Sequence, residues 1–547
     1  MPMTFDAVVV GAGFAGLYAL YRLRSRGYAV CVLEAEAGIG GTWYRNRYPG
    51  ARCDIESLQY SYSFSDEVQQ AWNWTERYAS QPEILRYIRH VADRFDLHRD
   101  IRLNARMTAA TFDENRRRWA IETEAGPCYD AAFCIMATGC LSVPIDPEIP
   151  GLAAFAGDLY RTTDWPHDGV EFSGRRVGIV GTGSSGIQTI PIVARAADRL
   201  TVFQRTANYV IPAHNRPLAP AEQVEWKGDY PARRAAARRT RNNALMEHNS
   251  QPGAGMTPEE REEILEARWR LGGLTFSYGF PDQATDRRVN DAAGDFVRRK
   301  IAGTVRDPET ARKLMPRDHP VGSKRLCVDT GYFETFNRPN VRLVDLRDEP
   351  LLTVEPEGVR TERALYPLDA LILATGFDAM TGALRRIDPK GRGGRSLREK
   401  WDVRPSTLLG LAVAGFPNLF IVTGPGSPSV LSNMVTSAEQ NVDWIADCLD
   451  YLRANGFAAI EALQNAEDAW FEEVAAASAR TLLPEGNSWY VGANVPGKPR
   501  VYMPYLGGVP AYLDACRKAA ADGYCAFAVT PADAAAGEEA RAPSKAV

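Results

Sequence analysis

The sequence lacks the features that mark membrane, secreted and metal-dependent proteins. No apolar run reaches the roughly 20 residues that a membrane-spanning helix needs, and no signal peptide precedes the strand expected at Phe5 to Val10. The nine cysteines are scattered without a Cys-x-x-Cys pair, and the six histidines show no ligand spacing. We therefore expect a cytoplasmic protein without a bound metal and without membrane contact.

The sequence also lacks an excess of either charge. It has 64 Lys and Arg against 68 Asp and Glu, a net charge of -4, and 45% hydrophobic residues, the composition of an ordinary soluble enzyme. Without a basic excess, nucleic acid is not an expected partner. A chain of 547 residues predicts about three domains.

A first glycine-rich turn follows the strand expected at Ala7 to Val10. It precedes a helical pattern and reads Gly11, Ala12, Gly13, Phe14, Ala15, Gly16. A strand, turn and helix in this order are typical of dinucleotide binding, because the helix N-terminus receives a pyrophosphate and glycine lets the backbone approach it. Glu34 ends the next strand, where a carboxylate can bind both ribose hydroxyls. This pattern favours FAD or NAD.

A second glycine-rich turn follows the strand expected at Arg176 to Val180. It reads Gly181, Thr182, Gly183, Ser184, Ser185, Gly186. The next strand ends in Gln204, Arg205 and Thr206, so an arginine replaces the acidic residue. Arginine accommodates a 2′-phosphate, which favours NADPH at this turn. Two such sites, the first for FAD, imply hydride transfer from nicotinamide to flavin.

Alternating strand and helix patterns predict an α/β fold with two Rossmann-like dinucleotide-binding domains. Charged helical segments from Pro212 to His319 predict an inserted helical domain, and strand patterns return near 341–344, 370–374 and 419–423. The Ala-Thr-Gly segments at 137–139 and 374–376 resemble points where flavoproteins cross between domains. We expect an FAD domain at 1–144 and 376–547, an NADPH domain at 145–211 and 320–375, and a helical insertion at 212–319.

Local signals predict several helix ends. Ser80 with Glu83 reads as a capping box, and further helices are expected to begin at Thr257 with Glu260 and at Asp307 with Pro308. The last residues, Thr530 to Val547, are rich in Ala, Pro and Glu, and we expect them to lack fixed structure.

Two longer motifs resemble signatures of one enzyme family. The first is Gly40-Gly41-Thr42-Trp43-Tyr44-Arg45-Asn46-Arg47-Tyr48-Pro49-Gly50-Ala51-Arg52-Cys53-Asp54. The second is Phe155-Ala156-Gly157-Asp158-Leu159-Tyr160-Arg161-Thr162-Thr163-Asp164-Trp165-Pro166. Both are similar to motifs of the type I Baeyer–Villiger monooxygenases, most closely the phenylacetone and steroid types. Arg161 stands where the family has a histidine, which puts the coupling that this histidine provides in doubt.

The resemblance implies roles for individual residues. Arg325 matches the active-site arginine, whose permanent charge suits stabilisation of an anion. Asp54 matches the carboxylate that pairs with it, and Lys324 the lysine that joins Arg205 on the 2′-phosphate. Trp489 resembles a tryptophan that closes over NADP and substrate, with a packing role as the alternative. Further residues that the resemblance assigns to the cofactor sites are Gly41, Thr42, Trp43, Tyr60 and Gln188.

The resemblance also implies a reaction. Reduced FAD takes up O2 to give a C4a-peroxyflavin, which inserts one oxygen atom next to a ketone carbonyl and yields an ester or lactone. The segment Ser429 to Met434 resembles the longer loop of the phenylacetone and steroid types, so aryl, open-chain or bulky cyclic ketones are expected, with sulfoxidation as a further activity. Two alternatives remain. One is an N- or S-oxygenating flavin monooxygenase, and the other is a flavin-binding protein that has lost turnover, against which Arg325, Asp54 and Arg205 argue although Arg161 departs from the motif. A disulfide reductase is disfavoured, because Cys31 and Cys53 lack a partner at short spacing.

Overall fold

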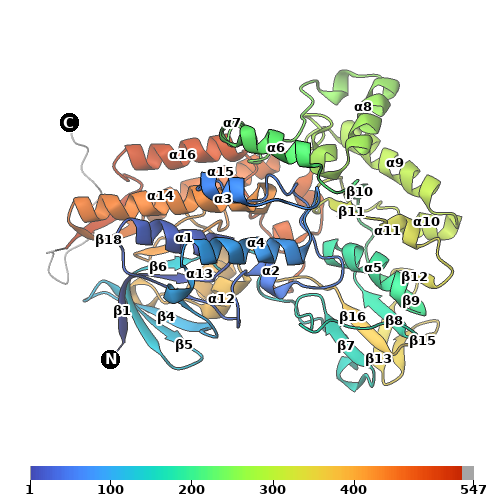
Figure 1. Cartoon of the computed structure of the whole chain (residues 1–547), viewed down its shortest axis with the longest axis horizontal. Helices are drawn as coiled ribbons and strands as arrows, with labels where there is room; N and C mark the ends of the chain where they lie inside the picture. The colour runs from blue at the N-terminus through green and yellow to red at the C-terminus, as the bar shows by residue number, and fades with distance from the viewer. Residues whose placement is uncertain (1, 533–547) are drawn as a thin grey trace.

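The computed structural model of the chain describes residues 2–532 and is built around one mainly parallel and one fully parallel sheet. The first sheet has the strand order β3-β2-β1-β6-β5-β4, with β17 also paired to β6. Its strands are β1 (Met3–Val10), β2 (Val30–Leu33), β3 (Ile101–Arg102), β4 (Met107–Asp113), β5 (Arg118–Thr123), β6 (Cys128–Met136) and β17 (Leu419–Ile421). Only the pairs β4 with β5 and β5 with β6 are antiparallel. Figure 1 shows this sheet at the lower left.

The second sheet is parallel throughout and has the order β12-β9-β8-β16-β7. Its strands are β7 (Asp158–Arg161), β8 (Arg176–Val180), β9 (Arg199–Gln204), β12 (Val341–Asp345) and β16 (Ala370–Leu373). The strands expected from the sequence at 176–180, 341–344, 370–374 and 419–423 are therefore confirmed, within two residues at each end. The chain leaves the first sheet after β6 and returns to it with β17. This confirms the predicted α/β class with two Rossmann-type sheets.

The remaining strands form small sheets beside these two. They are β10 (Val210–Pro212) with β11 (Cys327–Asp329), β13 (Leu351–Glu355) with β14 (Gly358–Thr361) and β15 (Leu365–Pro367), and β18 (Phe457–Ala462) with β19 (Phe527–Pro531). Because Thr530 and Pro531 pair with β18, the expectation that they lack fixed structure is wrong. Residues 533–547, the rest of that prediction, lie outside the described residues.

Eleven α-helices of the described residues precede β12, and two of them, α1 and α5, follow the glycine turns directly. The eleven are α1 (Phe14–Ser25), α2 (Thr42–Arg45), α3 (Asp66–Ala71), α4 (Gln81–Arg94), α5 (Ser184–Ala196), α6 (Pro220–Gly228), α7 (Tyr230–Ala237), α8 (Pro258–Leu271), α9 (Arg287–Thr304), α10 (Pro308–Leu314) and α11 (Tyr332–Thr335). Helices α6 to α10 occupy the predicted insertion. Val289 and Phe296 of α9 share one buried cluster with Val177 and Ile179 of β8, so these helices and the second sheet have a common core.

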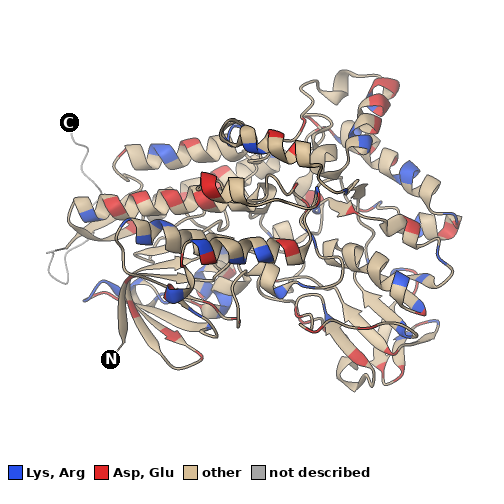
Figure 2. Ribbon diagram, in the orientation of Figure 1, with Lys and Arg blue, Asp and Glu red and all other residues tan. Residues whose placement is uncertain are grey.

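The helices of the second half cover the first sheet. They are α12 (Gly382–Ile387), α13 (Leu397–Val403), α14 (Met434–Ala454), α15 (Gln464–Ala479) and α16 (Val509–Ala521). In Figure 1, α14 and α16 lie above α1 on the first-sheet side of the molecule. Figure 2 shows both signs of charge on the outer helices, with several acidic residues in succession along α14. Within residues 2–532, no helix combines the length and the apolar character that crossing a bilayer demands.

The predicted helix starts are confirmed in two cases and corrected in one. Thr257 and Glu260 form a capping box on α8, and Asp307 accepts a hydrogen bond from the Thr310 N–H on α10. Ser80 precedes α4, but its side chain makes no capping hydrogen bond. The Glu83 carboxylate is buried and instead accepts hydrogen bonds of 2.8 Å from the Thr75 N–H and hydroxyl. The Glu83 carboxylate therefore bonds to Thr75 and not to the N-cap residue, because buried polar groups need hydrogen-bond partners.

Candidate active site

The first glycine turn leaves no room for side chains. Gly11 has φ +105°, and a Cβ there would lie 2.7 Å from the Ala137 carbonyl oxygen. A Cβ on Gly16 would lie 1.8 Å from the Gly11 carbonyl oxygen. Gly13 precedes α1 without a side-chain cap, so the first N–H groups of α1 are available to an anion.

A cavity of about 450 Å³ opens beside this turn, and we call it the cofactor cavity. Of the predicted site residues, it is lined by Gly11, Gly13, Phe14, Ala15, Glu34, Gly41, Thr42, Trp43, Asp54, Tyr60, Ser184, Ser185, Gln188, Arg325 and Trp489. The structure thus brings residues from both glycine turns to one cavity. Of the same set, Gly16, Gly181, Thr182, Gly183, Gly186, Arg205, Thr206 and Lys324 do not line it.

Glu34 lies at the end of β2 as the sequence predicts, and its side chain is buried. Its carboxylate accepts hydrogen bonds from the Ala12 N–H at 2.6 Å and the Glu36 N–H at 2.9 Å. Burial raises the pKa of this carboxyl, and the backbone donors oppose that rise. The carboxylate therefore fixes the end of the first glycine turn and also faces the cofactor cavity, where a ribose would lie.

The second glycine turn repeats the same geometry. Gly181 has φ +111°, and a Cβ on Gly186 would lie 2.2 Å from the Gly181 carbonyl oxygen. A Cβ on Gly183 would meet no atom within 4 Å, so space for a ligand remains there. The Thr182 hydroxyl donates to the Thr206 carbonyl at 2.9 Å and joins this turn to the segment after β9.

Two cations lie together near the end of β9. Arg205 is exposed, and the Lys324 ammonium donates to the Asn487 carbonyl at 2.5 Å. Burial lowers the pKa of Lys324, Asp318 opposes this, and Arg205 lowers that pKa further. Arg205 and Lys324 are thus close enough for their charges to repel, and a dianion between them would relieve the repulsion.

Helix α5 also contacts the first signature motif. The Tyr48 hydroxyl donates to Gln188 Oε1 at 2.9 Å, and Gln188 Nε2 donates to the Arg52 carbonyl at 3.2 Å. Gln188 therefore links the second glycine turn to the first signature motif. That Gln188 binds a cofactor stays a prediction. Cys327 was not predicted, yet its Sγ lies 3.3 Å from Ser184 Oγ. No sequence pattern around Cys327 predicts this contact.

Arg325 and Asp54 form a two-pronged ion pair, as the sequence predicts. Arg325 Nε donates to Asp54 Oδ2 at 2.7 Å and Nη2 to Oδ1 at 2.9 Å, while Nη1 donates to the Val430 carbonyl at 2.7 Å. Burial acts to lower the pKa of Arg325, but Asp54 and the Tyr490 hydroxyl outweigh it and raise that pKa. The guanidinium is therefore a permanent, fixed positive charge. The contact between Tyr490 and Arg325 was not predicted.

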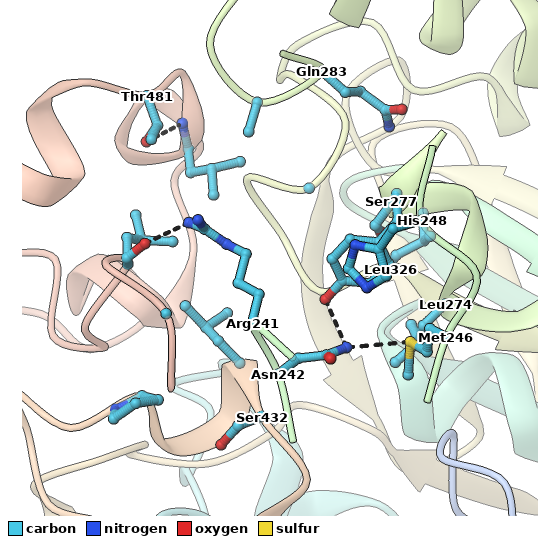
Figure 3. Close-up of a pocket in the computed structure, with 18 of the residues that line it drawn as sticks. Arg241, Asn242, Met246, His248, Leu274, Ser277, Gln283, Leu326, Ser432 and Thr481 are labelled. Carbon is cyan, nitrogen blue, oxygen red and sulfur yellow. Dashed lines mark hydrogen bonds between the residues drawn. The ribbon is translucent and has the colours of Figure 1, made fainter. Parts of the chain in front are cut away.

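A second cavity, of about 370 Å³, adjoins the first at Arg325, and we call it the substrate cavity (Figure 3). The two cavities share Ile55, Arg325, Val430 and Ser432. Most other walls of the substrate cavity are apolar or aromatic, among them Met246, Leu274, Phe280, Leu431 and Leu483. Arg325 is thus the cation that faces both cavities.

Trp489 lies on the boundary between the same cavities. It lines the cofactor cavity, while its neighbour Tyr490 lines the substrate cavity, and their ring centroids are 4.3 Å apart. The segment after Trp489 contacts residues 377–378, which follow β16. Asn494 Nδ2 donates to the Phe377 carbonyl at 2.7 Å, and Lys498 Nζ pairs with Asp378 at 2.6 Å. These anchors were not predicted, because they join distant segments.

Arg161, which replaces the signature histidine, lies in β7 and lines neither cavity. Its guanidinium pairs with Asp146 at 2.8 Å, in the segment that leads from the first sheet to the second. Within residues 2–532, no three His, Cys, Asp or Glu side chains are grouped to hold a metal ion.

Comparisons with known proteins agree with this geometry. A family model described as pyridine nucleotide-disulphide oxidoreductase matches residues 8–219. The chain is 40% identical over 533 residues to an acetone monooxygenase (methyl acetate-forming) of Gordonia sp. (strain TY-5), covering 96% of this chain and 99% of the relative. It is 40% identical to a phenazine N-monooxygenase of Lysobacter antibioticus, covering 96% and 95%. A Baeyer–Villiger monooxygenase of Pseudooceanicola batsensis is also 40% identical, with 95% of each chain covered.

Solved structures show the same likeness. A steroid monooxygenase bound to NADP matches with a TM-score of 0.93 and 50% identity, covering 97% of this chain and 100% of the other. A complex of OTEMO with FAD and NADP matches with a TM-score of 0.93 and 39% identity, again covering 97% and 100%. The chain therefore belongs to the Baeyer–Villiger monooxygenase family of NADPH-dependent flavoprotein monooxygenases.

Proposed function

We propose that the protein inserts one oxygen atom of O2 next to the carbonyl of a ketone, using FAD and NADPH, and forms an ester or lactone. The observation that carries this proposal is the position of Arg325, a cation held by Asp54 where the cofactor cavity meets the substrate cavity. A fixed cation beside an apolar cavity suits a reaction in which negative charge develops on a substrate oxygen.

The residues present fit both cofactors. The uncapped N-terminus of α1, the close-packed glycines and the buried Glu34 would hold the pyrophosphate and ribose of FAD. The open space at Gly183 and the paired cations Arg205 and Lys324 would hold NADPH through its phosphates. When bound, these groups supply the electrons and the activated oxygen.

The chain's own residues then orient and stabilise the reactants. The Arg325 guanidinium stabilises the charge on the carbonyl oxygen, and Asp54 and the Val430 carbonyl fix its plane. Trp489 and Tyr490 line the two cavities on either side of their boundary. Each role follows from contacts to Arg325 or to the cavity walls.

The size and walls of the substrate cavity support aryl, open-chain or bulky cyclic ketones. Ligand cavities of about 300 to 1,000 Å³ bury most of a compact organic molecule, and this cavity falls within that range. The relatives whose names give acetone and steroid substrates span small and large ketones. A soft thioether of similar size fits the same walls, so we propose sulfoxidation as a further activity.

N-oxygenation is the second candidate function. The phenazine N-monooxygenase, at 40% identity over nearly the whole chain, supports it. An amine substrate would not need the charge of Arg325 on a carbonyl oxygen, so the two functions differ in their dependence on this residue.

We further propose the division into an FAD domain at 1–144 and 376–547, an NADPH domain at 145–211 and 320–375, and an insertion at 212–319. The membership of β7, β8, β9, β12 and β16 in one sheet and of β17 in the other supports it. The nine free cysteines support a reducing, cytoplasmic location.

A product analysis tests the proposal. The purified protein is incubated with NADPH, O2 and, separately, phenylacetone, cyclohexanone, a thioether and an aromatic amine, and the products are identified by mass. We expect esters or lactones from the ketones. N-oxide formation without any ester would favour the second candidate.

A further inference from the structure

Arg241 is a second cation in the substrate cavity, and it has no acidic partner. No Asp or Glu lines this cavity. Arg325 is neutralised by Asp54, whereas among residues 2–532 no carboxylate lies within ion-pair distance of the Arg241 guanidinium. One of its N–H groups donates to the Leu506 carbonyl. In Figure 3 the Arg241 side chain extends away from Ser277 and His248, toward the carbonyl that its guanidinium contacts.

The wall opposite Arg241 offers further donors (Figure 3). The Tyr278 hydroxyl accepts a hydrogen bond from Asn242 Nδ2 at 2.9 Å, and its own proton has no acceptor in the part of the chain that the structure describes. Asn249 Nδ2 is buried without a partner. Gln283 Oε1 is also buried without a partner, but it is an acceptor and does not donate to an anion. Buried polar groups that remain unpaired mark a missing partner.

The electrostatic potential at the cavity wall that carries Tyr278 and His248 is positive. The His248 ring lies 4.2 Å from the Tyr278 ring, and burial, Arg268 and Arg241 all lower the pKa of His248. A neutral imidazole there adds no negative charge. The partner that would satisfy these donors and this field is therefore an anionic group with acceptor oxygens.

We propose that Arg241 and Tyr278 form a carboxylate subsite, so that the preferred ketones are keto acids. This inference rests on the proposed function and names its substrate class. A carboxylate presents two acceptor oxygens, which match the forked N–H groups of arginine and the Tyr278 hydroxyl. Arg325 lies where the substrate cavity meets the cofactor cavity, whereas Arg241 lines only the substrate cavity. A keto acid is therefore held at two points and in one direction.

The test compares two ketones that differ only in charge. The holoenzyme is assayed with 4-(2-oxopropyl)benzoate and with 4-methylphenylacetone, and kcat/KM is measured for each. We expect the acid to be preferred by about 10- to 100-fold, the usual effect of a charged hydrogen bond. Arg241→Met removes this preference and leaves the neutral ketone within about twofold. Arg241→Lys keeps part of it. Arg239→Met, an exposed arginine two residues away that lines neither cavity, keeps all of it.

Three outcomes would overturn the inference. They are equal kcat/KM values for the two ketones in the unaltered enzyme, equal losses on both ketones in Arg241→Met, and a preference for the matching carboxamide over the carboxylate. Binding of 4-propylbenzoate, which has no ketone, is measured separately by calorimetry on the holoenzyme. We expect Arg241→Met to weaken it by a similar factor. If no ketone is oxidised but this acid binds through Arg241, the proposed function fails while the subsite stands.

Discussion

The side chains of Arg325 and Asp54, 271 residues apart in the sequence, meet through two parallel hydrogen bonds. The pair fixes the guanidinium plane, and the third contact, to the Val430 carbonyl, comes from the loop before α14. Three segments that are distant in sequence thus fix the orientation of the Arg325 guanidinium. Asp54→Asn is the substitution that alters this arrangement with the least change in shape.

Replacing Asp54 by Asn should reduce ester formation strongly. The amide keeps the shape but loses the charge and one of the two acceptor contacts, so the guanidinium is no longer fixed. We expect kcat to fall by about 10²- to 10³-fold, the usual loss when a preorganised charge is disturbed. The FAD content, read from the flavin spectrum, should stay unchanged. Glu56→Gln is the control, because Glu56 pairs with Arg77 outside both cavities. Equal losses in both variants would contradict the account.

Replacing Arg205 by Gln should change the choice of nucleotide. The charge of Arg205 acts on Lys324, so loss of the Arg205 cation removes a contact to the 2′-phosphate and nothing from NADH. We expect KM for NADPH to rise by about 10- to 100-fold, while KM for NADH stays within about twofold. Steady-state kinetics with both nucleotides measure this. A parallel rise in both KM values would show that Arg205 acts on the fold instead.

The middle and last glycines of the second turn should respond differently to alanine. A methyl group at Gly186 would lie 2.2 Å from the Gly181 carbonyl oxygen, whereas one at Gly183 meets nothing within 4 Å. Gly186→Ala should lower the free energy of unfolding by several kcal/mol, and Gly183→Ala should change it by less than about 0.5 kcal/mol. Gly183→Ala should still raise KM for NADPH, because its methyl group occupies the approach of the pyrophosphate. Urea unfolding and kinetics distinguish the two effects.

The half-buried carboxyl of Asp329 should make stability fall as the pH rises. Burial raises its pKa to about 7, well above the ordinary value near 3.9. Between these values the native state holds a proton that the unfolded chain has released, so stability is greatest below about pH 4 and declines up to about pH 7. Asp329→Asn should remove this part of the decline.

Urea midpoints at pH 5 and pH 8 measure that effect. The native protein should lose more stability between the two values than Asp329→Asn does. Asp295→Asn serves as the control, because Asp295 is an exposed carboxylate on α9. If Asp329→Asn and the native protein show the same change with pH, then Asp329 does not hold its proton in the folded state.

The sequence predicted those parts of the molecule that local sterics determine. Gly16 and Gly186 must be glycine because the carbonyl oxygens of Gly11 and Gly181, five residues earlier, leave no space for Cβ, and Gly11 and Gly181 have positive φ, so the spacing of the glycines reveals the turns. Strand β8 begins and ends at the predicted residues, because its apolar run ends at the glycine turn. Arg325 and Asp54 were paired only through resemblance, since nothing local links them.

The rest depended on packing between distant segments. Arg241, Tyr278 and Leu506 meet only when the segment after α7 lies against the chain before α16, and neither segment carries a motif. Tyr490 reaches Arg325, and Cys327 reaches Ser184, for the same reason. The predicted cap at Ser80 failed because Glu83 is needed as a buried acceptor for Thr75.

The most direct test of the central claim follows oxygen from O2 into the product. The holoenzyme is supplied with NADPH, ¹⁸O2 and phenylacetone, alongside the Arg325→Lys variant, and the ester is analysed by mass. We predict an ester with one ¹⁸O atom from the unaltered enzyme, and a fall of about 10²- to 10³-fold in its rate in Arg325→Lys, which keeps the charge but not the two-pronged contact to Asp54. NADPH oxidation that yields only hydrogen peroxide, or an ester rate that Arg325→Lys leaves unchanged, would contradict the account.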